Sequence, residues 1–551
     1  MKTVNGTVAL PLVCSLIVLS LFVCVSSEER FYDWTVSFST RSILGVEKKV
    51  IVINDQFPGP LLNGSTNDVL NVNIHNNLDE PFLMSWNGVQ LRGSSWQDGV
   101  QGTNCPIPPG KNWTYSFQLK DQIGSYFYFP SLHLHKAAGG YGPIRIYNTP
   151  VVHPPFPCPD YDLDILISDW YTEDIQVLRE SLDRTGMLKF PHGILINGHG
   201  PEQASLDFQP GKTYMLRISN VGIKTSLNFR IQGHNMTLVE TEGSYTVKHD
   251  FDNLDIHVGQ SYSVMVKALE HKNGASYYMS ASPRFSLMQA SGIGFVRYNQ
   301  FRGNPGTPLS KSPLKFDLLA SWVQIKNIRV DVAVGAARPN PQGSFHYGRI
   351  NVTRTIVLEG KMARVYGKPR YAINGVSFVY PDTPLKLADH FNISGVYELG
   401  TIPEMPHFTY RLLLARPGVS VIQTNLHDFT QIVFHNPLRS VQTWHLDGYN
   451  FFVVGMGPGI WSALDMRSYN LKDAVYRSTV QVYPYSWTAV YVAMDNEGMW
   501  NLRSGNADQR YLGQELYIKV KGPEDDPSKI SPRDEAPIPA NVIKCGKAAQ
   551  L

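Results

Sequence analysis

Apolar and polar residues alternate with a period of two along most of the chain. Segments 213–219 and 263–268, for example, carry apolar side chains at alternate positions, as strands with one buried face do. Helical spacing is rare and short, as at 177–182. Turn residues separate the apolar stretches, and the chain has 45 Gly and 37 Pro to supply them. The pattern predicts an all-β chain built from Greek-key β-sandwiches or barrels.

This alternating pattern occurs in three similar units. An apolar run that ends in asparagine recurs at three places, Val52-Ile53-Asn54, Leu195-Ile196-Asn197 and Ala372-Ile373-Asn374. Segment 229–235 is also similar to segment 444–450. Repetition of a unit of roughly 150 residues predicts three domains. The boundaries that we expect are 28–150, 160–305 and 340–525, followed by a C-terminal tail at 526–551, with linkers near 150–159 and 303–313.

The first residues have the order of a secretory signal. Lys2 precedes an apolar run from 8 to 25, and Ser26-Ser27-Glu28-Glu29 follows it. We interpret 1–27 as a signal peptide, and the length of the run leaves a membrane anchor as the alternative. No other segment is apolar enough to predict a membrane span. The polar C-terminal residues also lack the hydrophobic tail of a glycolipid anchor, so we expect a secreted protein.

Charge, cysteines and sequons agree with an extracellular glycoprotein. A net charge of +3 without a basic run argues against a nucleic-acid partner. Cys14 and Cys24 leave with the signal, and the other three cysteines predict one disulfide and one free thiol in an oxidising compartment. Five glycosylation sequons follow the signal, at Asn63, Asn112, Asn235, Asn351 and Asn392.

Four motifs in a fixed order carry a resemblance to a known family. They are Phe57-Pro58-Gly59-Pro60, Trp96-Gln97-Asp98-Gly99, Cys105-Pro106-Ile107-Pro108-Pro109-Gly110 and Gly139-Gly140-Tyr141-Gly142. With them, nearly the whole mature chain resembles the plant multicopper oxidases, laccases and ascorbate oxidase. The resemblance implies three cupredoxin-like Greek-key domains. It also implies a disulfide between Cys105 and Cys545, which leaves Cys158 in a Pro-rich linker as an unreactive thiol.

The copper positions of that family carry few copper ligands here. Its trinuclear cluster is held by four H-x-H pairs, which fall on Ser85 and Asn87, Phe129 and Ser131, His445 and Asp447, and Val490 and Val492. Its mononuclear site falls on Gln442, Tyr491, Asn496 and Met499, when Trp487 is taken as the tryptophan of the W-x-x-H-C-H motif. Only His445 and Met499 offer suitable donors, and no thiolate is present. We therefore expect no bound copper as cofactor and no oxidase activity.

Other polar residues were weighed as sites. His133 and His135 form an H-x-H two residues beyond the expected register, and we expect structural roles for them rather than metal binding. His445 is expected to be a hydrogen-bonded core histidine near Asp447. Asp447 and Asp495 could form an acid and base pair of the glycosidase type, but nothing in their spacing singles them out.

Within the family, the resemblance is to the copper-poor skewed-growth (monocopper oxidase-like) proteins and the pollen-specific ascorbate oxidase homologues. It rests on residues 127–131, 135–140, 495–503 and 531–537. It implies a non-catalytic cell-wall glycoprotein that acts in cell expansion or pollen tube growth, with cell-wall components as partners. One alternative is an oxidoreductase of the laccase or ascorbate oxidase type with altered copper binding. The other is binding of a small molecule or sugar in the vacated cluster cavity, which the bulk of Phe129 and Tyr491 disfavours.

Overall fold

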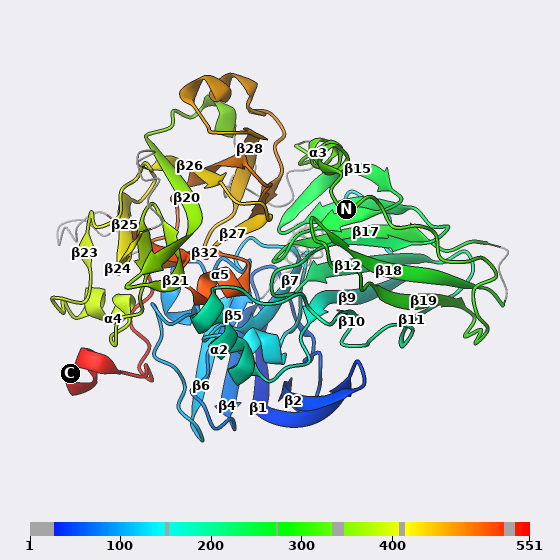
Figure 1. Ribbon diagram of the computed structural model, residues 1–551, viewed down its shortest axis with the longest axis horizontal. Helices are drawn as coiled ribbons and strands as arrows, with labels where there is room; N and C mark the ends of the chain where they lie inside the picture. Colours follow the sequence, from blue (N-terminus) through cyan, green and yellow to red (C-terminus); the bar gives the residue numbers. More distant parts are fainter. Residues whose placement is uncertain (1–26, 149–153, 271–273, 333–345, 407–413, 523–534) are drawn as a thin grey trace, which may run out of the picture.

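The protein consists of three β-sandwiches that lie side by side around a common centre (Figure 1). The computed structural model describes residues 27–148, 154–270, 274–332, 346–406, 414–522 and 535–551. The expected signal peptide therefore lies outside the described residues, apart from Ser27. Two sheets come from each third of the described chain, which Figure 1 colours blue, green, and yellow to orange. The prediction of an all-β chain is confirmed.

The strands of each sandwich follow one another along the chain, except where a crossover places non-consecutive strands side by side. The first sandwich has the sheets β2 (Val46–Ile53), β1 (Glu29–Ile43), β4 (Val69–Asn76), β6 (Asn112–Gln118) and β3 (Leu62–Ser65), β8 (Gly142–Tyr147), β7 (Gly124–Pro130), β5 (Met84–Asn87). The second has β10 (Gly193–Ile196), β9 (Tyr161–Trp170), β12 (Thr213–Asn220), β17 (Ser261–Lys267), β14 (Met236–Thr241), β15 (Ser244–Phe251) and β11 (Ala204–Phe208), β19 (Gly292–Tyr298), β18 (Ser276–Arg284), β13 (Ser226–Ile231), β16 (Leu254–Ile256). The third has β24 (Arg416–Gly418), β22 (Val376–Phe378), β21 (Lys368–Ile373), β20 (Arg354–Val365), β26 (Phe429–Asn436), β31 (Ser486–Ala493), β28 (Phe451–Pro458), β29 (Tyr476–Arg477) and β23 (Glu398–Leu399), β25 (Ser420–Asn425), β33 (Glu515–Lys521), β32 (Gly498–Ser504), β27 (Gln442–Leu446), β30 (Thr479–Val482).

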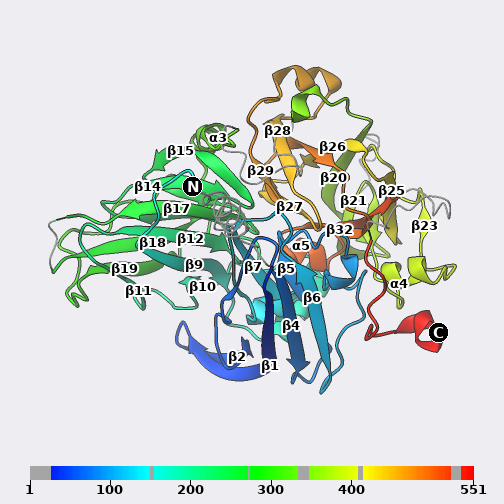
Figure 2. The same cartoon turned by 180° about the vertical axis from the view of Figure 1, so that it is seen from behind.

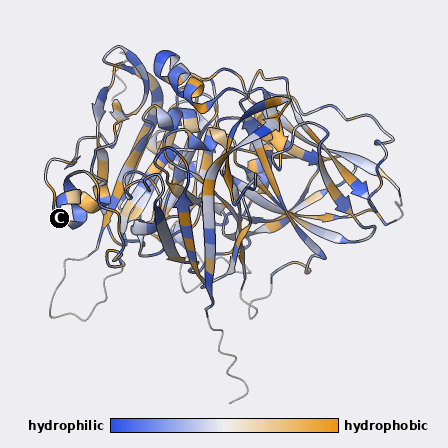
Figure 3. Ribbon diagram, turned by 90° about the horizontal axis from the view of Figure 1, so that it is seen from below, coloured by the Kyte–Doolittle hydropathy of each residue, from blue (hydrophilic) through white to orange (hydrophobic). Residues whose placement is uncertain are grey.

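Aromatic pairs join the two sheets of each sandwich. Trp34 of β1 lies 6.2 Å from Trp86 of β5, measured between ring centres. The corresponding distance is 4.0 Å for Phe208 of β11 and Tyr214 of β12, and 5.0 Å for Phe434 of β26 and Trp444 of β27. Large rings at these positions bury much apolar area between the sheets. The alternation of apolar and polar residues that produces such cores is visible along the strands in Figure 3.

The repeated asparagines have the same role in all three sandwiches. Asn54, Asn197 and Asn374 adopt positive φ angles of 49°, 49° and 47° in the turn after an apolar run. The side-chain oxygen of each accepts a hydrogen bond from a backbone N–H of the neighbouring strand, at 2.7, 2.7 and 2.8 Å. The side-chain amide of each donates to a carbonyl two residues earlier on that strand. Asparagine tolerates the left-handed conformation and supplies both groups, which explains why the sequence repeats it.

The described chain also contains short helices and 3₁₀ turns. The α-helices are α2 (Ile175–Thr185), α3 (Leu318–Asn327), α4 (Leu385–His390) and α5 (Ala507–Tyr511), and the 3₁₀ turns are η1 (Ser95–Gln97), η2 (His135–Ala138), η3 (Tyr347–Arg349), η4 (Ala463–Ser468) and η5 (Gly546–Gln550). Helix α2 contains the predicted segment 177–182. Asp174 caps its first turn and Gly186 ends it with φ 75°.

Buried hydrogen bonds and an ion pair connect the three sandwiches at the centre of the molecule. Ser125 of the first lies 2.8 Å from Ser263 of the second, between hydroxyl oxygens. Glu242 of the second forms an ion pair with Arg477 of the third at 2.7 Å. The third reaches the first through the amide of Asn496, which donates to a backbone carbonyl of the first sandwich at 2.9 Å. β5 and β7 lie near this centre in both views (Figures 1 and 2).

Candidate functional site

The first two expected ligand pairs lie side by side in the first sandwich. Ser85 of β5 is opposite Phe129 of β7 in the strand register, and both are buried. Asn87 donates its side-chain amide to the carbonyl of Gly259 at 3.0 Å, and Ser131 donates its hydroxyl to the carbonyl of Gly99. The hydroxyl of Ser85 has no hydrogen-bond partner among the described residues. None of the four side chains is an imidazole, so neither pair offers a copper ligand of the family type.

The third pair is fully engaged in hydrogen bonds. His445 of β27 is 1% exposed, and its Nε2 lies 2.9 Å from Oδ1 of Asp447. Its Nδ1 lies 2.7 Å from the hydroxyl of Thr479. Burial and the nearby Arg503 cation lower the pKa of His445, which favours the neutral ring. A neutral ring donates to Asp447 and accepts from Thr479, so neither nitrogen keeps a free lone pair for a metal.

The structure corrects the expected positions of Val490, Tyr491 and Val492. They lie on β31, which pairs with β26 and β28, whereas His445 lies on β27 in the other sheet of the third sandwich. Val490 and Val492 belong to the main apolar core, and Tyr491 packs among aromatic residues of a separate cluster. These three residues are therefore core residues of the third sandwich and do not flank His445.

Arg503 occupies the place beside His445 that Val490 was expected to take. It is opposite His445 in the pairing of β27 with β32. Its guanidinium forms an ion pair with Asp447, and its central carbon lies 5.7 Å from the ring centre of Phe129. Arg503 therefore joins the third pair to the second, across two sandwiches.

A second tryptophan, Trp500, can also be matched to the tryptophan of the family's W-x-x-H-C-H motif. When Trp500 is taken as the tryptophan of W-x-x-H-C-H, the last three positions fall on Arg503, Ser504 and Gly505. Trp487 fits the same frame, and the apolar alternation of β31 resembles that of β32, so the sequence pattern did not separate the two. The pairing of β32 with β27 does so, because it brings residues 503–505 to His445.

The mononuclear position is filled by a cluster of amides and one hydroxyl. Gln442 accepts a hydrogen bond from the amide of Gln514 at 3.3 Å. The N–H of Ser504 donates to the carbonyl of Gln514, and the hydroxyl of Ser504 donates to the side chain of Gln509, both at 3.0 Å. Gln442 was expected here; Ser504, Gln509 and Gln514 were not. All four side chains are buried, and none supplies a thiolate, a thioether or an imidazole.

Asn496 and Met499 do not belong to this cluster. Met499 lies five residues before Ser504 on β32, about 17 Å away along an extended strand. It packs in a separate apolar cluster that includes Val100 and Phe378. Asn496 donates its amide to the carbonyls of Gln90 and Gly448, so its role is to join the first and third sandwiches.

Buried charges surround the former cluster positions. Burial raises the pKa of Asp98 well above its ordinary value, and the neighbouring Asp447 charge raises it further. Burial alone would also raise the pKa of Asp447, but the Arg503 cation and the bond to His445 hold it well below its usual range. Lys136 lies 4.8 Å from the ring centre of Phe129, and burial lowers its pKa to about 7. Burial and the neighbouring charges therefore favour the protonated form of Asp98 and the ionised form of Asp447.

These residues do not fit a multicopper site. Of the eight cluster positions, with the fourth pair at Arg503 and Gly505, only His445 carries a copper donor of the family type. A guanidinium beside it adds positive charge where metal cations would be held. Among the described residues, no three or more His, Cys, Asp or Glu side chains are placed to hold a metal.

His133 and His135 lie outside this centre. Strand β7 ends at Pro130, and His133 follows in a turn with φ 49°. His135 lies 3.2 Å from Glu80, measured from Nε2 to Oε2, and Arg179 of α2 pairs with the same carboxylate at 2.9 Å. His135 therefore belongs to a contact between the first sandwich and α2, and the ring centre of His133 lies 6.4 Å from that of His135. Asp495 forms an ion pair with Arg92 at 2.8 Å, and among the described residues no hydrogen bond links it to Asp447.

One cysteine and most of the sequon asparagines are exposed, whereas Cys105 is buried. Cys105 and Cys545 form a disulfide, the pair that the family resemblance implies, and Cys158 is free and exposed. The sequon asparagines Asn112, Asn235, Asn351 and Asn392 are exposed, and Asn63 is half-buried. Asn235 lies in the exposed connection between β13 and β14. None of the described helices has the length and apolarity needed to cross a membrane.

Comparison with known proteins gives one family. Three models described as multicopper oxidase match residues 35–150, 162–300 and 382–526. A monocopper oxidase-like protein SKS1 of Arabidopsis thaliana is 47% identical over 94% of this chain and 89% of its own. An L-ascorbate oxidase homolog of Brassica napus is 45% identical over 97% and 96%. The crystal structure of Fet3p, a multicopper oxidase that functions in iron import, aligns with a TM-score of 0.74 at 21% identity over 90% of both chains, which shows the shared fold.

Proposed function

The chain belongs to the multicopper oxidase family, in its monocopper oxidase-like branch, and we propose that it is a secreted cell-wall glycoprotein that acts by binding rather than by copper-dependent oxidation. The observation that carries this proposal is the network of His445, Asp447 and Arg503. It satisfies the one remaining imidazole and places a cation where the family holds metal. Fold alone does not confer the oxidase reaction, because the chemistry depends on the ligands.

Hydrogen bonds replace part of the lost metal coordination at the mononuclear position. Gln514 donates to Gln442, Gln442 donates to the carbonyl of Gly360, and Ser504 donates to Gln509, although Oε1 of Gln514 has no partner among the described residues. The ring of Phe129 contacts two cations, with Nζ of Lys136 at 4.8 Å and the central guanidinium carbon of Arg503 at 5.7 Å from the ring centre. A set of vacant imidazoles would instead need new hydrogen bonds in a buried place. The mutual adjustment of these residues favours a stable copper-free protein over an oxidase that lacks its metal.

The extracellular part of the proposal rests on the N-terminal signal pattern and the sequons. Four of the five sequon asparagines are exposed, which a glycosyltransferase requires. The disulfide between Cys105 and Cys545 suits an oxidising compartment. A role in cell expansion or pollen tube growth, with wall components as partners, rests on resemblance to the skewed-growth and pollen-specific members.

Expression of the full chain in cultured plant cells tests this location. The proposal predicts protein in the medium and the wall fraction that loses mass on treatment with a glycosidase. A chain that begins at residue 28 is the control and should stay inside the cells without glycans. Retention of the full chain inside the cells, or release from membranes only by a phospholipase, would contradict the proposal.

A further inference from the structure

Helix α3 exposes apolar side chains and buries polar ones. Leu319 and Val323, four residues apart on one face, are 72% and 51% exposed. Phe316, three residues before Leu319, is 56% exposed. Ser321 and Gln324, on the other side of the helix, are buried. A surface helix of a soluble protein normally buries its apolar stripe, so α3 has the opposite orientation.

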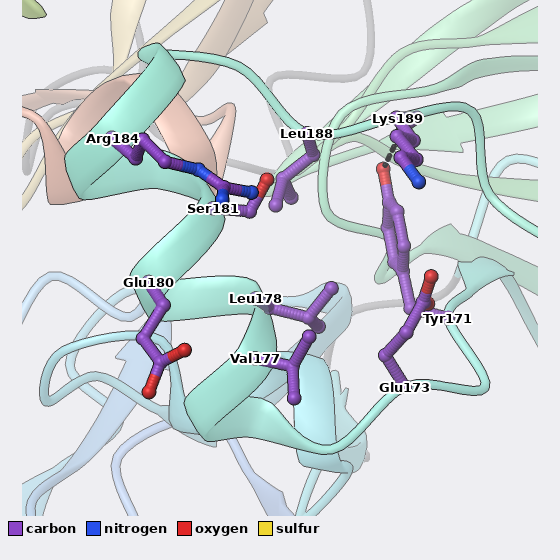
Figure 4. A pocket seen from close by; sticks show the side chains of 9 residues that line it. All are labelled: Tyr171, Glu173, Val177, Leu178, Glu180, Ser181, Arg184, Leu188 and Lys189. Atoms are coloured by element: carbon purple, nitrogen blue, oxygen red, sulfur yellow. Dashed lines mark hydrogen bonds between the residues drawn. The ribbon is translucent and has the colours of Figure 1, made fainter.

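Helix α2 shows the usual orientation for comparison. Its Leu178 and Leu182 are buried, and the carboxylate of Glu180 points away from the cavity beside the helix (Figure 4). Helix α3 lies at the periphery of the molecule, beside β15, in both views of the ribbon (Figures 1 and 2). The exposed apolar stripe therefore distinguishes α3 from α2, and its position leaves the stripe accessible to another molecule.

Polar contacts of the buried face hold α3 in this orientation. Gln324 donates its amide to the carbonyl of Asp255 at 2.9 Å and accepts from the N–H of the same residue at 2.7 Å. Ser321 donates its hydroxyl to the carboxylate of Asp255, which forms an ion pair with Arg284 at 2.9 Å. Rotation of the helix to bury Leu319 would break these bonds and leave buried polar groups without partners. The apolar face of α3 is therefore fixed at the surface.

The charges along α3 are complementary to those of a second, antiparallel copy. Lys326 is exposed near the C-terminal end, three residues after Val323 on the same face, and no ion pair with it occurs among the described residues. Asp317 caps the N-terminal end, where its carboxylate accepts from the N–H of Ala320 at 3.0 Å. An antiparallel copy brings each Lys326 to the Asp317 end of the other helix. It also places the negative end of each helix dipole beside a positive one.

We propose that the exposed face of α3 binds the same face of a second copy of this chain as an antiparallel pair. A two-fold axis through the middle of the helix places Leu319 of one copy against Val323 of the other. The same axis brings Lys326 of each copy to the exposed ring of Phe316. Few side chains take part, so we expect a weak dimer with a Kd on the order of 10–100 µM. This inference depends neither on the former copper positions nor on the cell wall.

Sedimentation equilibrium of the glycosylated full-length protein tests the pairing. We expect the average mass to rise from one chain towards two between about 1 µM and about 300 µM. Leu319→Lys and Val323→Glu should each remain monomeric over this range, because each places a charge in the apolar contact. Leu399→Lys, at an exposed leucine of β23 that lies far from α3 in both views, is the matched control and should dimerise as the wild type does (Figures 1 and 2).

An equimolar mixture of the two monomeric variants tests the antiparallel register. In a mixed pair, the lysine introduced by Leu319→Lys faces the glutamate introduced by Val323→Glu, and the second contact keeps its leucine and valine. We expect the mixture to dimerise with a Kd within roughly tenfold of the wild-type value. A monomeric wild type, a wild-type Kd for Leu319→Lys, or a mixture that stays monomeric would each overturn the proposal. Binding to vesicles of phosphatidylcholine and phosphatidylserine without self-association would overturn it in favour of a lipid surface.

Discussion

Arg503 and Asp447 form an ion pair in the interior of the protein, with exposed side-chain fractions of only 2% and 3%. The pair lies beside His445, where related oxidases bind copper, and it joins strand β32 to the end of β27. Two opposite charges at this place satisfy each other without metal.

Removal of the Arg503 charge should strongly destabilise the fold. Arg503→Leu leaves the Asp447 carboxylate buried without its partner, and we expect the free energy of unfolding to fall by about 3–5 kcal/mol. The measurement is urea denaturation followed by tryptophan fluorescence. Arg329→Gln is the matched control, because its pair with Asp473 at 3.3 Å is partly exposed, with side-chain fractions of 48% and 27%, and such a pair is worth about 0–1 kcal/mol. Equal midpoints for the two variants would contradict the role given to Arg503.

The protonated Asp98 should make stability depend on pH. Burial, and then the charge of Asp447, raises the pKa of Asp98 in the folded state. As pH rises above its ordinary pKa of about 3.9, the unfolded chain loses this proton while the folded chain keeps it. Stability therefore falls with rising pH, by up to about 1.4 kcal/mol per pH unit.

Asp98→Asn isolates this effect. Asparagine cannot titrate, so the difference in unfolding free energy, wild type minus variant, should decrease from pH 5 to pH 8. The Asp447 contribution does not interfere, because its lowered pKa affects stability only at more acidic pH. Parallel stability profiles for the two proteins over this range would show that Asp98 is ionised in the folded state.

The disulfide should contribute more to stability than the free cysteine. The pair of Cys105 and Cys545 closes a loop with a sequence separation of 440 residues. Chain entropy sets an upper limit of about 6 kcal/mol for such a closure, less any strain. Cys545→Ser should lower the denaturation midpoint, whereas Cys158→Ser should not. Equal denaturation midpoints for the two variants would mean that the disulfide does not stabilise the native protein.

The amide cluster should bind copper as a blue site only when all four ligands of that site are introduced together. The combined change Gln442→His, Ser504→Cys, Gln509→His and Gln514→Met supplies two imidazoles, a thiolate and a thioether from four neighbouring positions. We expect this variant, loaded with Cu(II), to show the intense blue absorption of a copper thiolate. Tyr491→Cys on β31 is the control and should show none, because no other ligand lies beside it. A blue band from Tyr491→Cys, or none from the fourfold variant when correctly folded, would refute the assigned positions.

The sequence predicted the strands and turns better than it predicted the residues around His445. Period-two alternation located strands such as β12 and β17, and the repeated Asn54, Asn197 and Asn374 marked three equivalent turns. Both signals are local, because they depend on side-chain alternation and on one turn conformation. They therefore survive in a single sequence.

The partner of His445 could not be found in the same way. Trp487 and Trp500 both begin a segment that fits the copper motif, and each lies on a buried strand of the third sandwich. The choice between them depends on which strand pairs with β27, a contact between residues 58 positions apart such as His445 and Arg503. Pairing over such a separation leaves no periodic signal in one chain.

Copper content with oxygen uptake tests the central claim most directly. The full-length protein, purified from plant cell medium and dialysed against Cu(II), would be assayed for bound copper, for blue absorption and for oxygen consumption with ascorbate and a phenol. Our account predicts less than roughly 0.1 copper per chain, no blue band and no uptake above the protein-free rate, because His445 alone cannot replace a multidentate site. Copper near one or more per chain, with turnover of either substrate, would contradict it.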